Sequence, residues 1–439
     1  MFLFCSDLTK VDLRGLYRLV GTANQWKAER VGDAGIVWLQ TPFTFVGTNG
    51  GEFMISLQRP EDPEPICQLR WFRSSRELLV TRRWSGELSI HIAQNLQRVI
   101  VTSHTRVAAM ACGGCPAEMK RLAPGHTLRV RLRRPEQGQS ARGRSSQATF
   151  GMTYAQTLAG VRREMYSSVS KLPNRFALLL SGGLDSSIIA GVARDIGKNV
   201  VPYVFSLKRP IVRQTRQESD LVCACIVAKH LGLRCREIML DAAKLVENVP
   251  LAILLAETPR GTIVDPSTGL IEVARRISKD GFSSVAIGEA ADDLFGSFTF
   301  ALRYMRGQGL RRYYRKELDV GLPDEMAVLQ RVFEPWGISL LDPFWTRRFK
   351  NIGYNIPLSF RLDPRRLMKR VLRDAFSDML PVEILLRPKV ITRDGTQIRY
   401  ALEERFGVSR ERYRPMFKRM FTEGRTWPKN LPQPKISRR

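Results

Sequence analysis

The chain has 439 residues, of which 44% are hydrophobic and 9% are aromatic. This composition excludes an intrinsically disordered protein, and the length exceeds what one average core supports, so we expect two globular domains. The 70 Lys and Arg residues outnumber the 42 Asp and Glu residues, and the resulting net charge of +28 favours anionic partners. A genome that uses Arg freely would produce the same excess.

The seven cysteines show no pairing framework. Cys112 and Cys115 have zinc-like spacing, but no second Cys pair or His pair lies at a matching distance, so we interpret them as reduced thiols in a turn. The first residues are apolar but lack the basic segment of a signal peptide, and no run approaches the ~20 apolar residues of a membrane span. We therefore expect a cytoplasmic protein without a membrane span.

Residues 1–134 are expected to form a β-rich α+β domain. Short β-branched segments, separated by Gly, Pro or charged turns, predict its strands. These segments are Ile36–Leu39, Phe53–Ser56, Cys67–Phe72, Glu77–Thr81, Leu88–Ile92, Val99–Thr102 and Thr127–Leu132. The polar stretch 135–150 has the composition of a linker.

Residues 151–405 alternate between helical and strand patterns after a first helix from Met152 through Val169. The following units are strand 175–180, helix 186–196, strand 200–206, helix 217–231, strand 235–240, helices 241–255 and 267–279, and strand 283–287. This alternation predicts a doubly wound parallel sheet with a ligand at the carboxyl ends of its strands. Residues beyond 300 are expected to be mostly helical, and we expect the basic segment 406–439 to be a mobile tail.

The stretch Ser181–Ser187 carries a strong chemical signal. It reads Ser-Gly-Gly-Leu-Asp-Ser-Ser, between an apolar run that predicts a buried strand and an apolar stripe that predicts a helix. We expect Ser186 or Ser187 to cap the first turn of this helix. A Gly-rich turn that leads into a helix binds phosphate, and Asp185 inside the turn requires a divalent cation.

This loop lacks the Gly-Lys-Ser/Thr ending of a Walker A loop and the third glycine of a dinucleotide fingerprint. In full, it resembles the pyrophosphate loop of the ATP pyrophosphatase superfamily, whose members cut ATP between the α- and β-phosphates.

A second cluster follows the predicted strand that ends near residue 287. Glu289, Asp292 and Asp293 lie within five residues, and such a group of carboxylates needs a cation or a task. Together with the Ser181 loop, residues 288–296 resemble the signature pair of the asparagine synthetase family, with Ala290 in place of Gly and Asp293 in place of Glu. Further similar segments are Glu218–Gly232, Leu340–Phe344 and Leu386–Gly395.

The resemblance covers about residues 152–400 and implies ATP and Mg²⁺ as cofactors. The nucleotide-binding residues that it implies are Ser181, Gly182, Gly183, Asp185, Ser186, Ser187, Leu207 and Gly288. It assigns Mg²⁺ to Asp185 and Asp292, makes Lys389 the catalytic lysine, and gives Glu289 the deprotonation of an attacking amine. A substrate carboxylate would attack the α-phosphate, pyrophosphate would leave into the loop, and an amine would attack the acyl-adenylate.

The N-terminal domain resembles, more faintly, the Ntn-type glutaminase half of the same family. Leu78–Gly86 and Arg121–His126 echo its pattern. The glutaminase nucleophile is a cysteine at position 2 whose own amine serves as base. Here Phe2 occupies that position, Cys5 would need unexpected processing, and Arg83 stands where the family has Asp. We therefore expect no glutamine hydrolysis.

Family members without that cysteine, such as β-lactam synthetases and lasso-peptide cyclases, take the amine from the substrate and close a ring. A large basic surface suits a peptide better than a small amino acid. We expect a peptide or small-molecule carboxylate as substrate, with lasso cyclase as the leading interpretation and a precursor peptide and its processing protease as partners. A β-lactam synthetase and an ammonia-using asparagine synthetase are the alternatives within the family.

Two hypotheses come from other classes. A basic tRNA-modifying ATP pyrophosphatase would suit the charge, but such proteins usually carry the loop near the N-terminus and lack the second motif, so we do not expect nucleic acid as a partner. A binding protein with a decayed ATP site conflicts with the intact motif residues, which are Ser181, Asp185, Glu289, Asp292 and Lys389.

Overall fold

The computed structural model describes residues 2–5, 26–31, 34–39, 44–49, 52–57, 65–72, 75, 77–85, 88–94, 99–111, 119–131, 141–142, 153–216, 218–296, 307–361, 367–409 and 411–422. The Cys112–Cys115 pair and most of the predicted linker 135–150 lie outside these residues.

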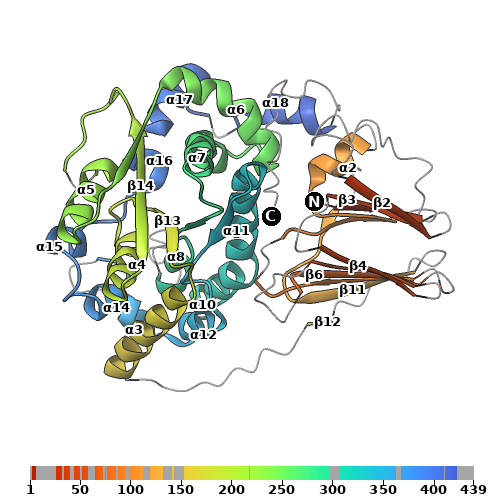
Figure 1. Cartoon of the computed structure of the whole chain (residues 1–439), viewed down its shortest axis with the longest axis horizontal. Coiled ribbons are helices and arrows are strands. Elements are labelled where there is room, and N and C mark those ends of the chain that lie inside the picture. Colours follow the sequence, from red (N-terminus) through yellow and green to blue (C-terminus); the bar gives the residue numbers. More distant parts are fainter. Residues whose placement is uncertain are drawn as a thin grey trace.

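The N-terminal region forms two antiparallel six-stranded sheets that stack on each other (Figure 1). Their strand orders are β10-β8-β9-β1-β3-β2 and β12-β11-β7-β6-β5-β4. The strands are Phe2–Cys5 (β1), Trp26–Val31 (β2), Ala34–Leu39 (β3), Thr44–Asn49 (β4), Glu52–Leu57 (β5), Cys67–Phe72 (β6), Glu77–Arg82 (β7), His91–Gln94 (β8), Val99–Thr102 (β9), Lys120–Arg121 (β10), His126–Arg131 (β11) and Ala141–Arg142 (β12). A short helix, Thr105–Ala111 (α2), follows β9.

Alternation of side chains along the strands builds a separate core in this region. In β6, Cys67, Leu69 and Trp71 are buried, while the residues between them are more exposed. These side chains belong to one cluster with Ile92 and Val101 from the other sheet. The predicted β-rich N-terminal domain is confirmed, although β8 begins three residues later than the predicted segment.

The second region is built on five parallel strands in the order β15-β14-β13-β16-β17. Their bounds are Arg175–Leu179 (β13), Asn199–Leu207 (β14), Arg236–Leu240 (β15), Ser284–Ala286 (β16) and Ser339–Leu341 (β17). Strand order reverses between β13 and β16, which is the topological switch point of a doubly wound sheet. The predicted fold of this domain is confirmed.

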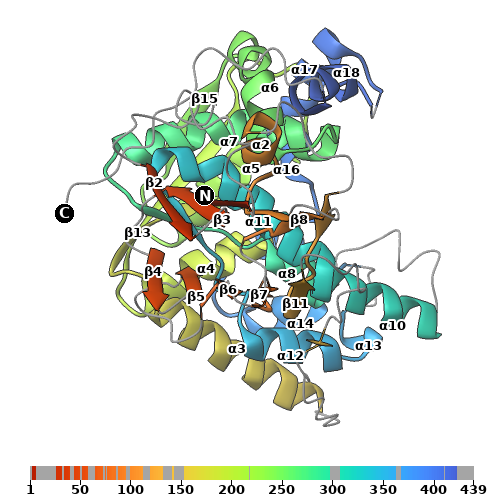
Figure 2. The same ribbon diagram turned by 90° about the vertical axis from the view of Figure 1, so that its right-hand side faces the viewer.

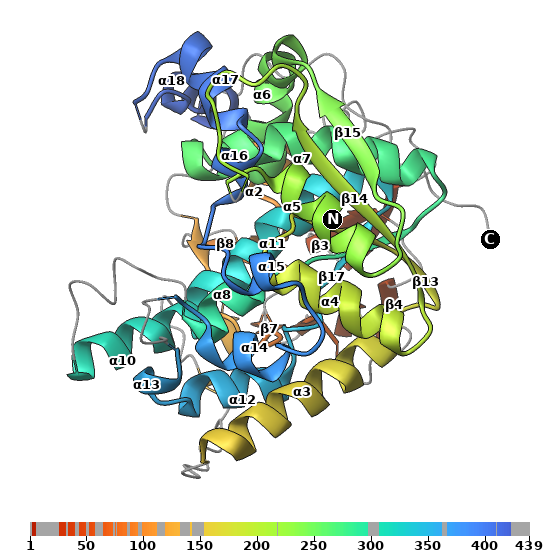
Figure 3. The same ribbon diagram turned by 90° about the vertical axis from the view of Figure 1, so that its left-hand side faces the viewer.

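Helices cover both faces of this sheet. The first set is Tyr154–Ser170 (α3), Leu184–Asp195 (α4), Asp220–His230 (α5), Ala242–Ala256 (α6), Gly261–Lys279 (α7) and Ala290–Phe295 (α8). In Figures 1 and 3, α4 and α5 lie on one side of the strands and α7 lies on the other. Burial explains the positions of α4 and α7, because Ile188, Ile189 and Val192 of α4 and Ile271 and Val273 of α7 are fully buried.

The remaining described chain is mostly helical, as expected. Its helical segments are Gly307–Lys316 (α10), Glu317–Gly321 (η3), Leu322–Phe333 (α11), Glu334–Trp336 (η4), Arg347–Asn355 (α12), Leu358–Arg361 (α13), Arg370–Ala375 (α14), Val382–Leu385 (α15), Thr392–Gly395 (α16), Ile398–Phe406 (α17), Arg414–Phe417 (α18) and Lys418–Thr422 (η5). Helix α11 lies on the same side of the sheet as α7, between the sheet and the N-terminal domain (Figure 1).

Two sequence-based boundaries are wrong. Helix α7 begins at Gly261, six residues before the predicted start, because Pro266 is accommodated inside the helix. The segment after residue 406 is not a mobile tail throughout, since Tyr413, Met420 and Phe421 are buried. Apolar side chains at helical spacing among the basic ones anchor it, and the Tyr413 hydroxyl donates to Asp265 Oδ1 at 2.9 Å. Residues 423–439 lie outside the described residues.

Among the described residues, no helix combines the length and the apolar character that crossing a membrane requires.

Candidate active site

The two sequence motifs meet at the switch point of the parallel sheet. The Ser181 loop follows β13, the Gly288 turn follows β16, and these strands are direct neighbours that pair Leu178 with Ala286. At Gly288, a Cβ atom would lie 2.9 Å from the Cβ of Asp185, so only glycine allows the two motifs to touch. The prediction that they share one site is consistent with this contact.

The Ser181–Ser187 loop leads into α4 and leaves the N–H groups at the start of that helix available. Gly182 has φ +66°, and a Cβ there would lie 2.3 Å from the carbonyl carbon of Cys223, so no other residue fits. Gly183 is the N-cap of α4, and no side chain accepts a hydrogen bond from the first turn of the helix. A helix N-terminus without a side-chain cap presents its N–H groups and positive dipole end to an anion.

The expected capping by Ser186 or Ser187 is wrong. The helix starts at Leu184, so both serines lie inside its first turn. The Ser187 hydroxyl instead donates to the carbonyl of Gly183 at 2.7 Å, and the Ser186 hydroxyl lies 3.3 Å from Ser181 Oγ. The two side chains brace the loop from within, and this leaves the helix end open.

Arg387 ties the loop to the segment that carries Lys389. Its Nη1 donates to the carbonyl of Ser181 at 2.9 Å, and its Nη2 donates to Asp220 Oδ1 at 2.7 Å. Both side chains are buried. Burial, only partly offset by Arg387, raises the pKa of Asp220 to about 6. Because this pair joins three segments distant in sequence, the loop and Lys389 are held in one frame.

Two lysines and two carboxylates form the centre of the site. Lys369 Nζ lies 2.5 Å from Asp185 Oδ2 and also contacts Asp292 Oδ1. Lys389 Nζ contacts Asp292 Oδ2. Burial alone would raise the pKa of Asp292, but Lys369 and Lys389 lower it below the ordinary value, so this carboxylate is ionised.

Lys389 is charged for the same reason. Burial lowers the pKa of its ammonium group, but Asp292, Asp185 and Glu289 outweigh that effect and raise it above the ordinary value. A permanent ammonium group at the loop fits the charge-neutralising role that the resemblance implies for this lysine.

Sequence reasoning missed Lys369. The residue is only 3% exposed and has a left-handed backbone, with φ 61°, just before α14. A non-glycine residue in this conformation costs about 1 kcal/mol or more, and such strain is concentrated at functional sites. The sequence offered no signal, because Lys369 is one basic residue in an Arg-rich stretch and its partners lie far away along the chain.

Two further carboxyl groups, Glu289 and Glu325, line the same cavity. No hydrogen bond or ion pair links either side chain to another group in the part of the chain that the structure describes. Burial, and then the charge of Asp292, raise the pKa of Glu289. Burial, and then the charge of Glu289, raise the pKa of Glu325 to about 8. Glu325 was not singled out by the sequence. Asp293, which belongs to the second motif, is buried and does not line the cavity.

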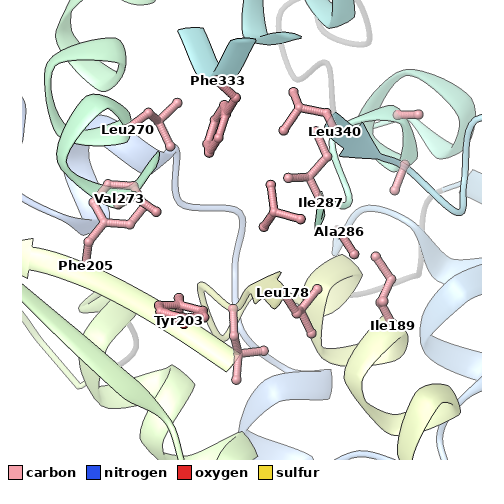
Figure 4. Close-up of a cluster of buried hydrophobic side chains, with 14 of the residues drawn as sticks. Leu178, Ile189, Tyr203, Phe205, Leu270, Val273, Ala286, Ile287, Phe333 and Leu340 are labelled. Carbon is pink, nitrogen blue, oxygen red and sulfur yellow. The ribbon is translucent and has the colours of Figure 1, made fainter. Parts of the chain in front are cut away.

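The cavity has a volume of about 420 Å³. Its polar end is formed by the loop, the carboxylates and the lysines, and one of its other walls is largely apolar. Figure 4 shows Leu270, Phe333, Leu340 and Ile287 around a common space that Tyr203 bounds from the strand side. Apolar side chains lower the local dielectric constant, which strengthens the electrostatic interactions at the polar end.

Most of the predicted site residues line this cavity. They are Ser181, Gly183, Asp185, Ser186, Gly288, Glu289, Asp292 and Lys389. Gly182, Ser187 and Leu207 do not line it. Leu207 is buried at the end of β14, where its N–H donates to the carbonyl of Thr396 at 3.0 Å. Its predicted contact with nucleotide is therefore not supported by the position of its side chain.

The donor set suits Mg²⁺ bound to a nucleotide. Asp185 and Asp292 contact the same ammonium group, so their oxygens are close enough to share a cation, and Asp185 Oδ1 is buried without a hydrogen-bond partner. No group of three or more His, Cys, Asp or Glu side chains in the described ranges forms a complete metal site. Mg²⁺ at phosphate sites needs only one or two carboxylates, because phosphates and waters supply the other ligands.

Asp342 holds the second motif in place through backbone hydrogen bonds. Its carboxylate accepts hydrogen bonds from the N–H of Ala290 at 2.8 Å and of Phe344 at 2.9 Å. Burial raises its pKa to about 7. The Leu340–Phe344 segment, which the resemblance singled out, therefore supports the start of α8, and α8 carries Asp292.

Comparison with known proteins agrees with this geometry. The family model described as asparagine synthase matches residues 160–332 and 304–419, which together span more than half of the chain. The chain is similar to the glutamine-hydrolyzing asparagine synthetase of Rattus norvegicus (27% identity over 225 residues) and to that of Gallus gallus (29% over 229 residues). Each match covers 50% of this chain and 40% of the relative, so the chain matches less than half of the length of these relatives.

Among solved structures, the U34-tRNA thiolase NcsA from Methanococcus maripaludis with its [4Fe-4S] cluster is 14% identical. The match covers 64% of this chain and 85% of that chain, and its TM-score of 0.29 is too low to carry weight. The family model, the parallel sheet and the paired motifs agree, and the chain belongs to the asparagine synthase family.

Proposed function

We propose that this protein is an ATP-dependent amide synthetase that activates a carboxylate as an acyl-adenylate, releases pyrophosphate, and transfers the acyl group to an amine. The observation that carries the proposal is the meeting of the Ser181 loop, the Gly288 turn and two lysines around one cavity at the switch point.

Each part of the cavity has a task in this reaction. The N–H groups at the start of α4 and the Lys389 ammonium group receive the departing pyrophosphate. Asp185 and Asp292 would hold Mg²⁺, which neutralises phosphate charge when it is bound. Lys369, which lies between these carboxylates, would turn toward phosphate oxygens. Glu289 accepts a proton from the attacking amine, and its raised pKa makes it a stronger base than an ordinary glutamate.

The amine is proposed to come from the substrate itself, so that the product is a cyclic peptide of the lasso type. Support comes from the N-terminal domain, where Cys5 is the last residue of β1 and is paired with Gly35 and Ile100 on its two sides. The backbone of Cys5 is therefore held within the sheet and not at a free chain end. The net charge of +28 favours a large anionic substrate over a single amino acid. A precursor peptide and a protease that trims it would then be the partners.

Asparagine formation from aspartate and ammonia is the second candidate. The relatives at 27–29% identity are asparagine synthetases, and their similarity favours the same acyl donor. The two candidates share the adenylation step and differ in the donor and the amine.

The test is carboxylate-dependent exchange of labelled pyrophosphate into ATP, followed by mass spectrometry of the products. The panel contains L-aspartate with ammonia, and peptides with one internal Asp or Glu and a free N-terminal amine. We expect a peptide to support exchange and to lose one water on cyclisation. Asparagine formation at a useful rate would contradict ring closure, and absence of exchange with every carboxylate would contradict the synthetase.

A further inference from the structure

Helix α11 lies between the cavity and the N-terminal domain. Figure 2 views the molecule through the N-terminal domain, and α11 lies behind its strands. One face of α11 lines the cavity with Glu325, Val328, Leu329 and Phe333, at the spacing of a single helical face. Other side chains of α11 and of the turn after it point to the N-terminal domain. The helix is therefore a direct structural link between that domain and the synthetase site.

The start of α11 is held by two arginines of the N-terminal domain. Asp324 lies 2.5 Å from Arg121 Nη2 and 3.5 Å from Arg82 Nη2. Arg82 is almost fully buried, and its guanidinium group also donates to the carbonyls of Leu88 at 2.8 Å and Leu122 at 2.7 Å. Because its own domain fixes Arg82, this arginine presents a rigid contact to the residue directly before Glu325.

The end of α11 is held by a second group. Arg331 donates to Ser89 Oγ of the N-terminal domain at 3.2 Å and to the last carbonyls of α6, including Ala256 at 3.1 Å. Glu334, directly after the helix, pairs with His104 at 3.0 Å and with Arg106 at 3.6 Å.

A third contact locks the same interface. Glu257, at the end of α6, accepts hydrogen bonds from the N–H and the hydroxyl of Thr105, at 2.9 Å and 2.8 Å, and so caps α2 from the other domain. Glu257 has a left-handed backbone, with φ 55°. Among the described residues, the side-chain contacts of Glu257 are with the neighbouring domain or the arginines at the interface. These contacts hold the residue in its unfavourable backbone conformation.

We propose that the N-terminal domain is a positioning element for the synthetase site, which clamps both ends of α11 so that Glu325 and the apolar residues of this helix keep their places in the cavity wall. This role rests on the proposed function and gives the domain a task without glutamine hydrolysis. Arg121, Arg82 and Ser89 are positioning residues, since they contact α11 and do not line the cavity.

The test uses the full chain and three variants. Arg121→Ala removes one clamp contact, and Arg121→Lys keeps the charge. Arg129→Ala is the matched control, because Arg129 is exposed and pairs with Glu77 inside the N-terminal domain. Hydrogen exchange of peptides covering residues 322–333 is measured first, because it needs no substrate. Pyrophosphate exchange and amide formation are then measured with the best carboxylate of the panel.

We expect Arg121→Ala to speed hydrogen exchange in α11 at least threefold and to slow amide formation about tenfold, with a smaller effect on pyrophosphate exchange. Arg121→Lys should recover most of the loss, and Arg129→Ala should match the wild type. Unchanged hydrogen exchange of α11 in Arg121→Ala would overturn the clamp. Equal losses of pyrophosphate exchange and amide formation would also overturn it. If the wild type catalyses no pyrophosphate exchange, the proposed function fails, and the hydrogen-exchange result still decides whether the domain clamps α11.

Discussion

Two sets of carboxyl groups in this molecule differ in how they are paired. At the domain interface, each of Glu257, Glu334 and Asp324 has at least one basic partner from the N-terminal domain. At the cavity, Asp292 is paired with lysines, but Glu289 and Glu325 have no hydrogen-bond or ion-pair partner within the described residues.

This difference separates a structural joint from a reactive site. Carboxylates that the protein itself pairs contribute to folding, because a buried charge is tolerated when a partner compensates for its desolvation. Carboxyl groups left without partners beside a cavity, such as Glu289 and Glu325, have a raised pKa and are available to a ligand. Changes at the interface should therefore act first on stability and reach activity only through α11, whereas changes at the cavity should act directly on catalysis.

The largest expected effect is at the cavity. Asp185→Asn should lower pyrophosphate exchange by about 10³-fold or more, because it removes a negative ligand for Mg²⁺ and the partner of Lys369. Thermal unfolding should shift by only a few degrees. Asp378→Asn, which disrupts an exposed pair with Arg162, is the control and should keep full exchange. An unfolded Asp185→Asn protein would show instead that Asp185 is structural.

At the interface, Glu257→Ala should lower the free energy of unfolding by about 3–5 kcal/mol, because it removes the carboxylate that faces buried Arg331 and one of the two carboxylates that face buried Arg106. Urea unfolding measures this loss. Glu411→Ala breaks an exposed pair with Arg414 and should change stability by less than about 0.5 kcal/mol. Similar losses of unfolding free energy in the two variants would show that the buried interface carboxylate is no more important for stability than an exposed ion pair.

The loop backbone gives the next effect. Gly182→Ala should destabilise the protein by about 2–4 kcal/mol, since the new Cβ meets the backbone of Cys223 and the residue has φ +66°. MgATP binding, measured by calorimetry, should be lost. Gly160→Ala, in the open interior of α3, should instead stabilise the protein by about 0.5–1 kcal/mol. Retained MgATP binding in Gly182→Ala would exclude the loop as the phosphate site.

Acid should weaken the interface. Burial lowers the pKa of His104 and of His91 to about 4, so the unfolded chain binds protons first as the pH falls. Stability is complete above about pH 6.5 and is lost toward pH 4, by about 2 kcal/mol per histidine between pH 7 and pH 5. Urea unfolding at several pH values tests this slope. Replacement of exposed His230 by Gln should leave the slope unchanged, and a flat profile in the wild type would contradict the burial of neutral histidines.

The smallest effect concerns Glu325. Its folded pKa of about 8 lies above the ordinary value for Glu, so the folded state holds a proton that the unfolded state has released, and stability falls as the pH rises toward 8. Glu325→Gln removes this cost. We expect its midpoint of thermal unfolding to exceed that of the wild type by about 2–4 °C at pH 9 and to match it at pH 5. An equal shift at both pH values would assign the effect to packing.

The sequence predicted the parts of this molecule that local pattern determines. These parts are the buried parallel strands, the amphipathic helices and the two loops at the switch point. Each lies within a short stretch of sequence, so the pattern of its own residues predicts it. Strand β2 was missed because Lys27, Glu29 and Arg30 interrupt its apolar pattern, and sheet pairing with β3 decides its conformation.

Contacts between distant segments could not be predicted. Lys369 meets Asp185 across the fold, and nothing in its own neighbourhood distinguishes it from a surface lysine. The same holds for Asp324 and its partners Arg82 and Arg121, since a charged residue at a helix start usually faces solvent. The serine caps were mispredicted because the loop leaves its helix end open for a ligand, and a phosphate site is where local capping rules are expected to fail.

The most direct test of the central claim follows the oxygen atoms of the substrate. A peptide or aspartate whose carboxylate carries ¹⁸O is incubated with the enzyme, MgATP and the amine, and the AMP is examined by mass spectrometry. Attack of the carboxylate on the α-phosphate predicts that the AMP contains one ¹⁸O atom from the substrate. Unlabelled AMP, or release of ADP and phosphate, would contradict adenylation at the Ser181 loop.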